Sequence, residues 1–157
     1  MNYWLMKSEP SVFSIDDLAS RPKQIERWDG VRNYQARNML RDQMKVGDRA
    51  FFYHSSCDEP GIVGAMEIVR SGYMDPTAFD ANDHHYDPAS KTDNPRWYAV
   101  DVRFLKKFSR VITLAELKEY SELSSMWVLR KGNRLSITPV TANEWKIIGN
   151  IMTKQHV

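Results

Sequence analysis

The chain has 157 residues, of which 42% are hydrophobic and 27% are charged, and its formal net charge is +2. This composition is typical of a soluble globular protein, and we expect a single domain over residues 1–157 with a core of its own. The apolar runs are shorter than the roughly 20 residues of a membrane span, so no membrane partner is expected. The single cysteine, Cys57, excludes an internal disulfide and fits a reducing compartment, so the expected location is cytoplasmic.

The first forty residues carry the strongest local signals. Tyr3–Met6 is apolar and aromatic, which favours a strand. Ser14 and Asp17 have the spacing of a helix capping box. Trp28-Asp29-Gly30 predicts a turn, and residues 33–44 predict a helix with apolar side chains at three- and four-residue spacing.

The remainder of the chain predicts more strands, mixed irregularly with short helices. We expect strands over residues 49–55, 62–69, 97–105 and 135–140, and helices that begin after Thr113 and Thr141. Both faces of the 49–55 strand are apolar, which indicates cover on both sides. Residues 71–95 are rich in Asp, Asn and Pro and predict a long loop. The pattern favours an α+β fold: a small mixed β-barrel of five or more strands surrounded by short helices.

Charge is distributed unevenly along the chain. Between Asp75 and Asp93 there are five Asp and one cation, Lys91, whereas between Asp101 and Arg134 there are eight Lys or Arg and four acids. A net charge of +2 neither requires nor excludes a nucleic-acid partner, because local clusters matter more than the total. A solvated surface without a ligand explains this distribution about equally well.

No metal or catalytic site is predicted. The acidic loop contains His84 and His85, but adjacent residues point different ways on a regular element, and their spacing matches no zinc or calcium pattern. The segment His54-Ser55-Ser56-Cys57 lacks a nucleophile-elbow or cysteine-protease signature. We therefore expect a non-enzymatic protein without a cofactor.

The residues around the Trp28 turn have the chemistry of a nucleobase site. Trp28 and Tyr34 offer stacking surfaces worth about 1–3 kcal/mol per base, and the Asn33 amide can both donate and accept hydrogen bonds. Arg32, Arg37 and Arg41 could contact backbone phosphate. The alternative places both rings in the core and the arginines on a solvated helix surface. Residue chemistry alone favours this alternative slightly.

Several long motifs resemble those of the EVE domain family, and this resemblance favours the nucleobase site over the alternative. They are Tyr3–Pro10 and Trp28–Asn38, supported by residues 47–55, 61–64, 97–102 and 134–145. The resemblance implies a PUA-like fold related to the YTH readers. It also implies a pocket for a modified base in nucleic acid, with modified cytosine in DNA favoured over RNA. Carried over to this sequence, the ligand-binding residues are Lys7, Ser8, Trp28, Asn33, Tyr34, Arg37, Tyr53, His54, Ser55 and Trp127.

Two other functions remain open at this stage. A sensor of a free nucleobase, nucleoside or other small heterocycle would bind independently of salt, whereas a phosphate-contacting reader would weaken as salt rises. An enzyme acting on nucleotides would need His54 or the acidic loop for turnover, and nothing in the spacing favours it. The size and the absence of heptads favour a monomer.

Overall fold

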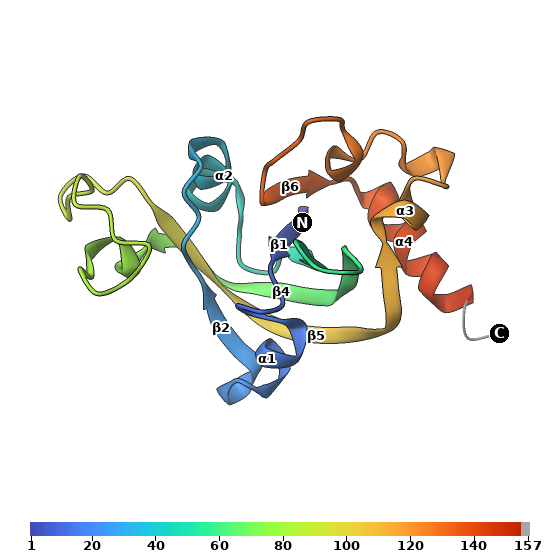
Figure 1. Cartoon of the computed structure of the whole chain (residues 1–157), viewed down its shortest axis with the longest axis horizontal. Coiled ribbons are helices and arrows are strands. Elements are labelled where there is room, and N and C mark those ends of the chain that lie inside the picture. The colour runs from blue at the N-terminus through green and yellow to red at the C-terminus, as the bar shows by residue number, and fades with distance from the viewer. Residues whose placement is uncertain (155–157) are drawn as a thin grey trace.

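The computed structural model describes residues 1–154, which fold into one six-stranded mixed sheet with short helices around it (Figure 1). The strands are β1 (Tyr3–Ser8), β2 (Ile25–Trp28), β3 (Arg49–His54), β4 (Gly61–Met74), β5 (Tyr98–Thr113) and β6 (Ile137–Val140). The α-helices are α1 (Ile15–Ser20), α2 (Tyr34–Asn38), α3 (Leu114–Leu117) and α4 (Ala142–Lys154). A π-helical turn follows α2 at Met39–Gln43, and 3-10 turns occupy Pro22–Gln24, Pro76–Phe79, Ser121–Leu123 and Trp127–Leu129.

The sheet is open, with the order β2-β5-β4-β3-β1-β6. The α+β class and the six strands confirm the predicted fold class, but the predicted closed barrel is wrong. Strand β2 pairs only with β5, and β6 pairs only with β1, so these two strands form the free edges. Hydrophobic patterns reveal strands but not whether the two outermost strands meet, and each edge strand here has only four residues.

Both faces of the sheet are buried. One core contains Trp4, Met6 and Phe52, and the other contains Leu5, Phe51 and helix α4 residues such as Ile148. This arrangement confirms the interpretation of β3 as a strand covered on both sides, because its alternate residues enter different cores.

The carboxyl ends of β1 and β3 lie side by side. The two strands are parallel, and their register pairs Lys7 with Tyr53 and Ser8 with His54. In a parallel pair both strands end at the same edge of the sheet. The polar residues that end these two strands therefore gather in one place.

The predicted loop at residues 71–95 begins later than expected, because β4 continues to Met74. The following segment projects from the sheet, at the left of Figure 1. Its base is anchored: the Asp75 carboxylate is fully buried and accepts from Gly30 N–H at 2.9 Å and from Arg32 Nη1 at 3.0 Å. These contacts bind the start of the loop to the turn after β2.

The predicted helix starts are largely confirmed. Ser14 and Asp17 form the reciprocal capping box of α1, and Thr141 and Glu144 form another before α4. Thr113 caps α3 through its hydroxyl alone, because the carboxylate of the residue at the third helical position bonds to Arg110 instead. Among the described residues, no helix is long and apolar enough to cross a membrane.

Candidate functional site

A cavity of about 350 Å³ lies between the end of β1 and strand β2. Its walls come from β1, the segment before α1, strand β2 with its following turn, and the projecting loop. The lining residues are Lys7, Ser8, Val12, Phe13, Glu26, Arg27, Trp28, Asp29 and His85. The cavity therefore combines aromatic and aliphatic surface with both cationic and anionic groups.

Trp28 is at once a core residue and a wall of this cavity. Its side chain is 7% exposed, and its ring packs edge-on against Phe13 at 6.3 Å and against Phe52 at 5.3 Å between centroids. The two interpretations of this residue are thus not exclusive. The core contacts hold the indole in place while the ring borders the cavity.

Tyr34 does not lie opposite Trp28. It is 52% exposed, is absent from the cavity lining, and stacks on Trp97 with ring centroids 4.9 Å apart. The Arg37 guanidinium lies 4.9 Å from the Tyr34 ring centre, and Trp97 Nε1 donates to Asp87 at 2.6 Å. Tyr34 and Trp97 therefore form a second aromatic surface outside the cavity.

Asn33 and Arg37 hold helix α2 and its surroundings together. Asn33 is the N-cap, and its Oδ1 accepts from Ala36 N–H at 3.0 Å. Arg37 donates to the Arg96 carbonyl at 2.7 Å and to Asn38 Oδ1 at 2.8 Å. A ligand-binding role for these two residues stays a prediction.

Lys7 and Ser8 are brought to the cavity as the register of β1 requires. Burial lowers the pKa of Lys7, whose ammonium lies 5.7 Å from the Tyr53 ring centre. The Ser8 hydroxyl donates to the Phe13 carbonyl at 2.6 Å and so fixes the cavity wall. Tyr53 itself is buried in the second core, and burial raises its pKa to about 12.

His54, Ser55 and Trp127 lie outside the cavity lining. His54 Nε2 accepts from Ile15 N–H at 3.2 Å, and burial lowers the pKa of this imidazole. Ser55 N–H donates to the Ser8 carbonyl at 3.0 Å. Trp127 packs against the first core and carries the Arg130 guanidinium 4.6 Å from its ring centre.

The Trp28-Asp29-Gly30 turn is tightly constrained. Gly30 has a φ angle of +75°, which residues with a side chain rarely adopt. A Cβ at this position would lie 2.5 Å from His85 Nε2. Asp29 Oδ2 accepts from Arg27 Nε at 2.8 Å, and this bond raises the pKa of Arg27. Only glycine therefore allows the His85 ring to lie against the turn.

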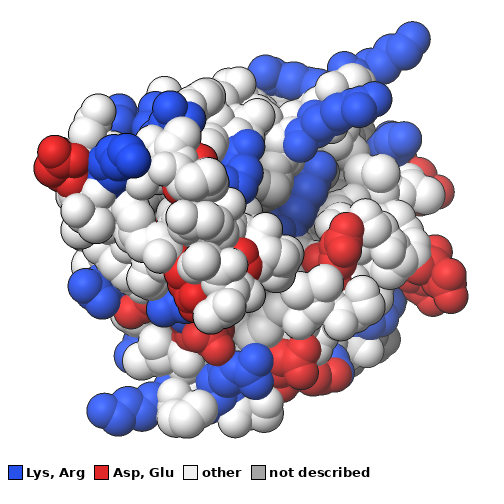
Figure 2. All heavy atoms as spheres, turned by 60° about the vertical axis from the view of Figure 1, so that its left-hand side comes forward, with Lys and Arg blue, Asp and Glu red and all other residues white. Residues whose placement is uncertain are grey.

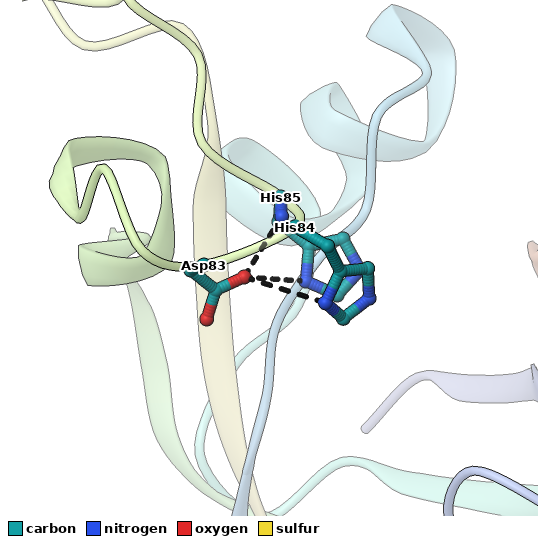
Figure 3. Close-up of side chains that lie close together, drawn as sticks. All are labelled: Asp83, His84 and His85. Carbon is teal, nitrogen blue, oxygen red and sulfur yellow. Dashed lines mark hydrogen bonds and ion pairs between the residues drawn. The ribbon is translucent and has the colours of Figure 1, made fainter.

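The projecting loop carries a cluster of Asp83, His84 and His85, drawn in Figure 3. The two imidazole rings lie 3.7 Å apart, because this segment belongs to no regular element, on which adjacent residues would point different ways. Asp83 Oδ1 lies 3.2 Å from His85 Nδ1 and 3.8 Å from His84 Nδ1. The cluster offers three potential metal-ligand atoms, but the His84 side chain is 78% exposed, and the same Asp83 oxygen also accepts His85 N–H at 2.8 Å.

A group of Lys and Arg side chains lies around a recess on one face of the molecule. Figure 2 shows Lys and Arg side chains around a recess in the upper right of the view, and acidic side chains in its lower half. The basic segment Arg130–Arg134 leads towards Ser136, whose carbonyl accepts from Lys7 N–H at 2.8 Å. Two cations, Lys7 and Arg27, line the cavity itself, despite the small net charge.

Comparisons with known proteins identify the family. The model of the EVE domain family matches residues 2–151. The chain belongs to the EVE domain family. Human thymocyte nuclear protein 1 is 50% identical over 98% of this chain and 75% of that protein. A protein from Pseudomonas syringae has a crystal structure with a TM-score of 0.91, at 50% identity, covering 96% of this chain and 99% of that one.

A third comparison includes a ligand. The crystal structure of the human THYN1 protein in complex with DNA containing 5-methylcytosine matches this EVE domain with a TM-score of 0.90. The two are 50% identical, over 97% of this chain and 98% of that chain. The expected cytoplasmic location is contradicted by the human relative, whose name is thymocyte nuclear protein 1. A low cysteine content indicates a reducing compartment, and it cannot separate cytosol from nucleus.

Sequence reasoning missed several residues of this EVE domain that border the cavity. Asp29 belongs to the predicted Trp28-Asp29-Gly30 turn, but only Trp28 of this turn was assigned to the site. His85 was considered only as a metal ligand, although its ring lines the cavity. Val12 and Phe13 follow a proline and carry no polar signal. Their contribution depends on how the chain returns across the end of β1.

Proposed function

We propose that this EVE domain binds DNA and reads a modified cytosine in the cavity between β1 and β2, without catalysing a reaction. The observation that carries the proposal is the complex of the human relative with DNA containing 5-methylcytosine, at 50% identity and a TM-score of 0.90. Relatedness at this level supports a shared ligand class. The cavity in this chain supplies the chemistry that such a ligand needs.

The cavity suits a single flat, polar ring. Its volume of about 350 Å³ is in the lower part of the range of small-molecule sites, about 300–1,000 Å³. Trp28 gives it an aromatic wall, and Lys7 and Asp29 supply a donor and an acceptor. A base would have to leave its stack to enter. A methyl group on the base would then gain apolar contact with the Val12 and Phe13 side of the cavity.

Binding without catalysis is also supported by the hydrogen bonding of His54, the histidine that an enzyme would use for turnover. His54 Nε2 already accepts a backbone N–H from Ile15, so its lone pair is engaged. A general base needs that lone pair for the proton it removes. We expect the domain to bind as a monomer, because the sequence is short and contains no heptad repeats.

Filling the cavity should abolish recognition while leaving the fold intact. Val12 lines the cavity and is 70% exposed, so Val12→Phe adds a ring at the mouth without disturbing the core. We expect the affinity for a 5-methylcytosine oligonucleotide to fall by on the order of 10-fold or more, because the base and the new ring compete for one space. Fluorescence anisotropy titrations with methylated and unmethylated DNA would measure this.

The matched control is Val46→Phe, which adds the same ring at a valine that is 63% exposed and lies outside the cavity lining. This variant should bind both oligonucleotides like the native chain. Equal binding of methylated and unmethylated DNA by the native chain would contradict the proposed function. If Val12→Phe kept the native preference for methylated over unmethylated DNA, the binding site would have to lie in another part of the molecule.

Salt separates a DNA reader from a sensor of free nucleobases. If the cations that line the cavity contact phosphates, each phosphate that they neutralise lowers the logarithm of the affinity by about 0.7–0.9 per tenfold rise in salt concentration. For three contacts, we expect the affinity to fall by more than 10-fold between about 50 and 200 mM salt. An affinity that does not change with salt concentration, together with full competition by free 5-methylcytosine, would favour the sensor of free nucleobases instead.

A further inference from the structure

We propose that the Asp29 carboxylate selects the exocyclic amine of the bound base, so that the cavity accepts 5-methylcytosine and rejects thymine. The inference rests on the proposed function, and it names the group that decides specificity within that site. The two bases share the 5-methyl group and differ at C4, where cytosine carries an amine that donates and thymine carries an oxygen that accepts. Apolar contact with the methyl group therefore cannot distinguish them.

Asp29 is placed to read that position. It follows Trp28, the aromatic wall, and lines the same cavity. Its side chain is 26% exposed, and Oδ2 accepts from Arg27 Nε at 2.8 Å. Within residues 1–154, Oδ1 has no hydrogen-bond partner. An ionised carboxylate accepts hydrogen bonds and cannot donate them. It therefore attracts an amine and repels a carbonyl oxygen.

The other carboxylate of the cavity wall is already engaged. Glu26 uses both carboxylate oxygens, one on Arg21 Nε at 2.7 Å and the other on Arg27 N–H at 2.8 Å. His85 directs Nδ1 towards Asp83, and its Nε2 lies against Gly30. Among the carboxylates lining the cavity, Asp29 alone keeps an oxygen available in the described part of the chain.

The turn that carries Asp29 is held rigidly from behind. Gly30 N–H donates to Asp75 Oδ2 at 2.9 Å, and Arg32 Nη1 bonds to the same oxygen at 3.0 Å. Arg32 also donates to the His85 carbonyl at 2.7 Å, which keeps the imidazole against the turn. A buried ion pair contributes little net stability, so its presence beside the cavity is explained better by positioning. Fixed geometry makes discrimination by a single hydrogen bond effective.

The test compares three single-stranded oligonucleotides that differ at one base: 5-methylcytosine, cytosine and thymine. Single strands remove the difference in unpairing energy between the bases. The native chain should prefer 5-methylcytosine to both others. In Asp29→Asn the side-chain amide can donate as well as accept, so the preference over thymine should shrink by on the order of 10-fold. The preference for 5-methylcytosine over cytosine, which depends on the methyl group, should remain.

The two comparisons separate the two proposals. If the native chain prefers 5-methylcytosine to cytosine but binds thymine equally well, Asp29 selects nothing and the reader function stands. Full retention of the thymine discrimination in Asp29→Asn would also overturn the inference. Equal affinity for all three bases would overturn both proposals. Loss of a negative charge raises affinity for any DNA, but that effect cancels in the ratio of affinities.

The matched control is Asp16→Asn, which removes an exposed carboxylate whose partner is Lys107 on the surface. It should change neither ratio. Thermal unfolding of both variants verifies that the domain is folded. Asp29→Asn keeps the shape of the side chain, so the turn should survive with its Gly30 contact unchanged.

Discussion

Asp75→Ala is expected to destabilise the domain by about 3 kcal/mol, because it removes a buried carboxylate that pairs with Arg32 and leaves the N–H groups of Gly30 and Thr77 without their acceptor. The carboxylate is fully buried, and it accepts from Arg32, from Gly30 N–H and from both the backbone and the hydroxyl of Thr77. Urea unfolding followed by circular dichroism at neutral pH measures the loss.

The matched control for this variant is Asp93→Ala, an exposed aspartate of the same loop. Its effect should stay within about 0.5 kcal/mol, as for most surface substitutions. A loss below about 1 kcal/mol in Asp75→Ala would mean that the loop is not fastened to the turn in solution. The selectivity inferred for Asp29 would then lack its support.

The same carboxylate predicts a pH dependence. Burial acts to raise the pKa of Asp75, but hydrogen bonds from Thr77, Gly30 and Arg32 outweigh it and leave the pKa lowered. A lowered pKa in the folded state stabilises the protein above the ordinary carboxyl value of about 3.9, and this stabilisation is lost as the pH falls below that value. Asp75→Asn should lack this contribution, so its stability should fall less steeply below about pH 4.

Trp28→Ala is expected to cost about 3–5 kcal/mol in unfolding free energy, because truncating a buried tryptophan leaves a void that its neighbours fill only in part. The ring is 7% exposed and packs on Phe13 and Phe52. Affinity for the modified base should fall as well, since the aromatic wall disappears. Urea unfolding, with oligonucleotide titration of the folded fraction, separates the two effects.

Trp28→Phe is the companion variant, because it keeps an aromatic ring and much of the buried volume. It should lose less stability than Trp28→Ala and retain measurable recognition of the base. If Trp28→Ala proved as stable as the native chain, the indole would not be a core residue in solution. Loss of binding in a fully folded Trp28→Ala variant would show that the exposed edge of the ring is what the ligand contacts.

Local signals in the sequence predicted the elements well. Ser14 with Asp17 and Thr141 with Glu144 form their capping boxes, because the cap depends only on residues three positions apart. Alternation along residues 49–54 predicted a strand buried on both faces, and both cores confirm it. The family followed from motifs long enough to exclude coincidence, and its model matches residues 2–151.

The candidate site was predictable only in part. Lys7, Ser8 and Trp28 reach the cavity because strand ends and turns place their own residues. Tyr34 was expected to stack on a base together with Trp28, yet it stacks on Trp97, which lies 63 positions further along the chain. No local pattern encodes such a partner. The role of His85 likewise depends on a loop that folds back onto Gly30.

The sequence by itself determined five of the six strands, the helix starts, the family and the aromatic turn after β2, because each is written in neighbouring residues or in long motifs. Strand β2 itself was not predicted. Only the tertiary structure decided that the sheet stays open between β2 and β6, that a cavity lies between the end of β1 and strand β2, and that Asp29 lines this cavity with one oxygen available. The physical reason is that edge pairing and the approach of a distant loop depend on contacts between residues far apart in the chain. Their net energies are small differences that no short segment reveals.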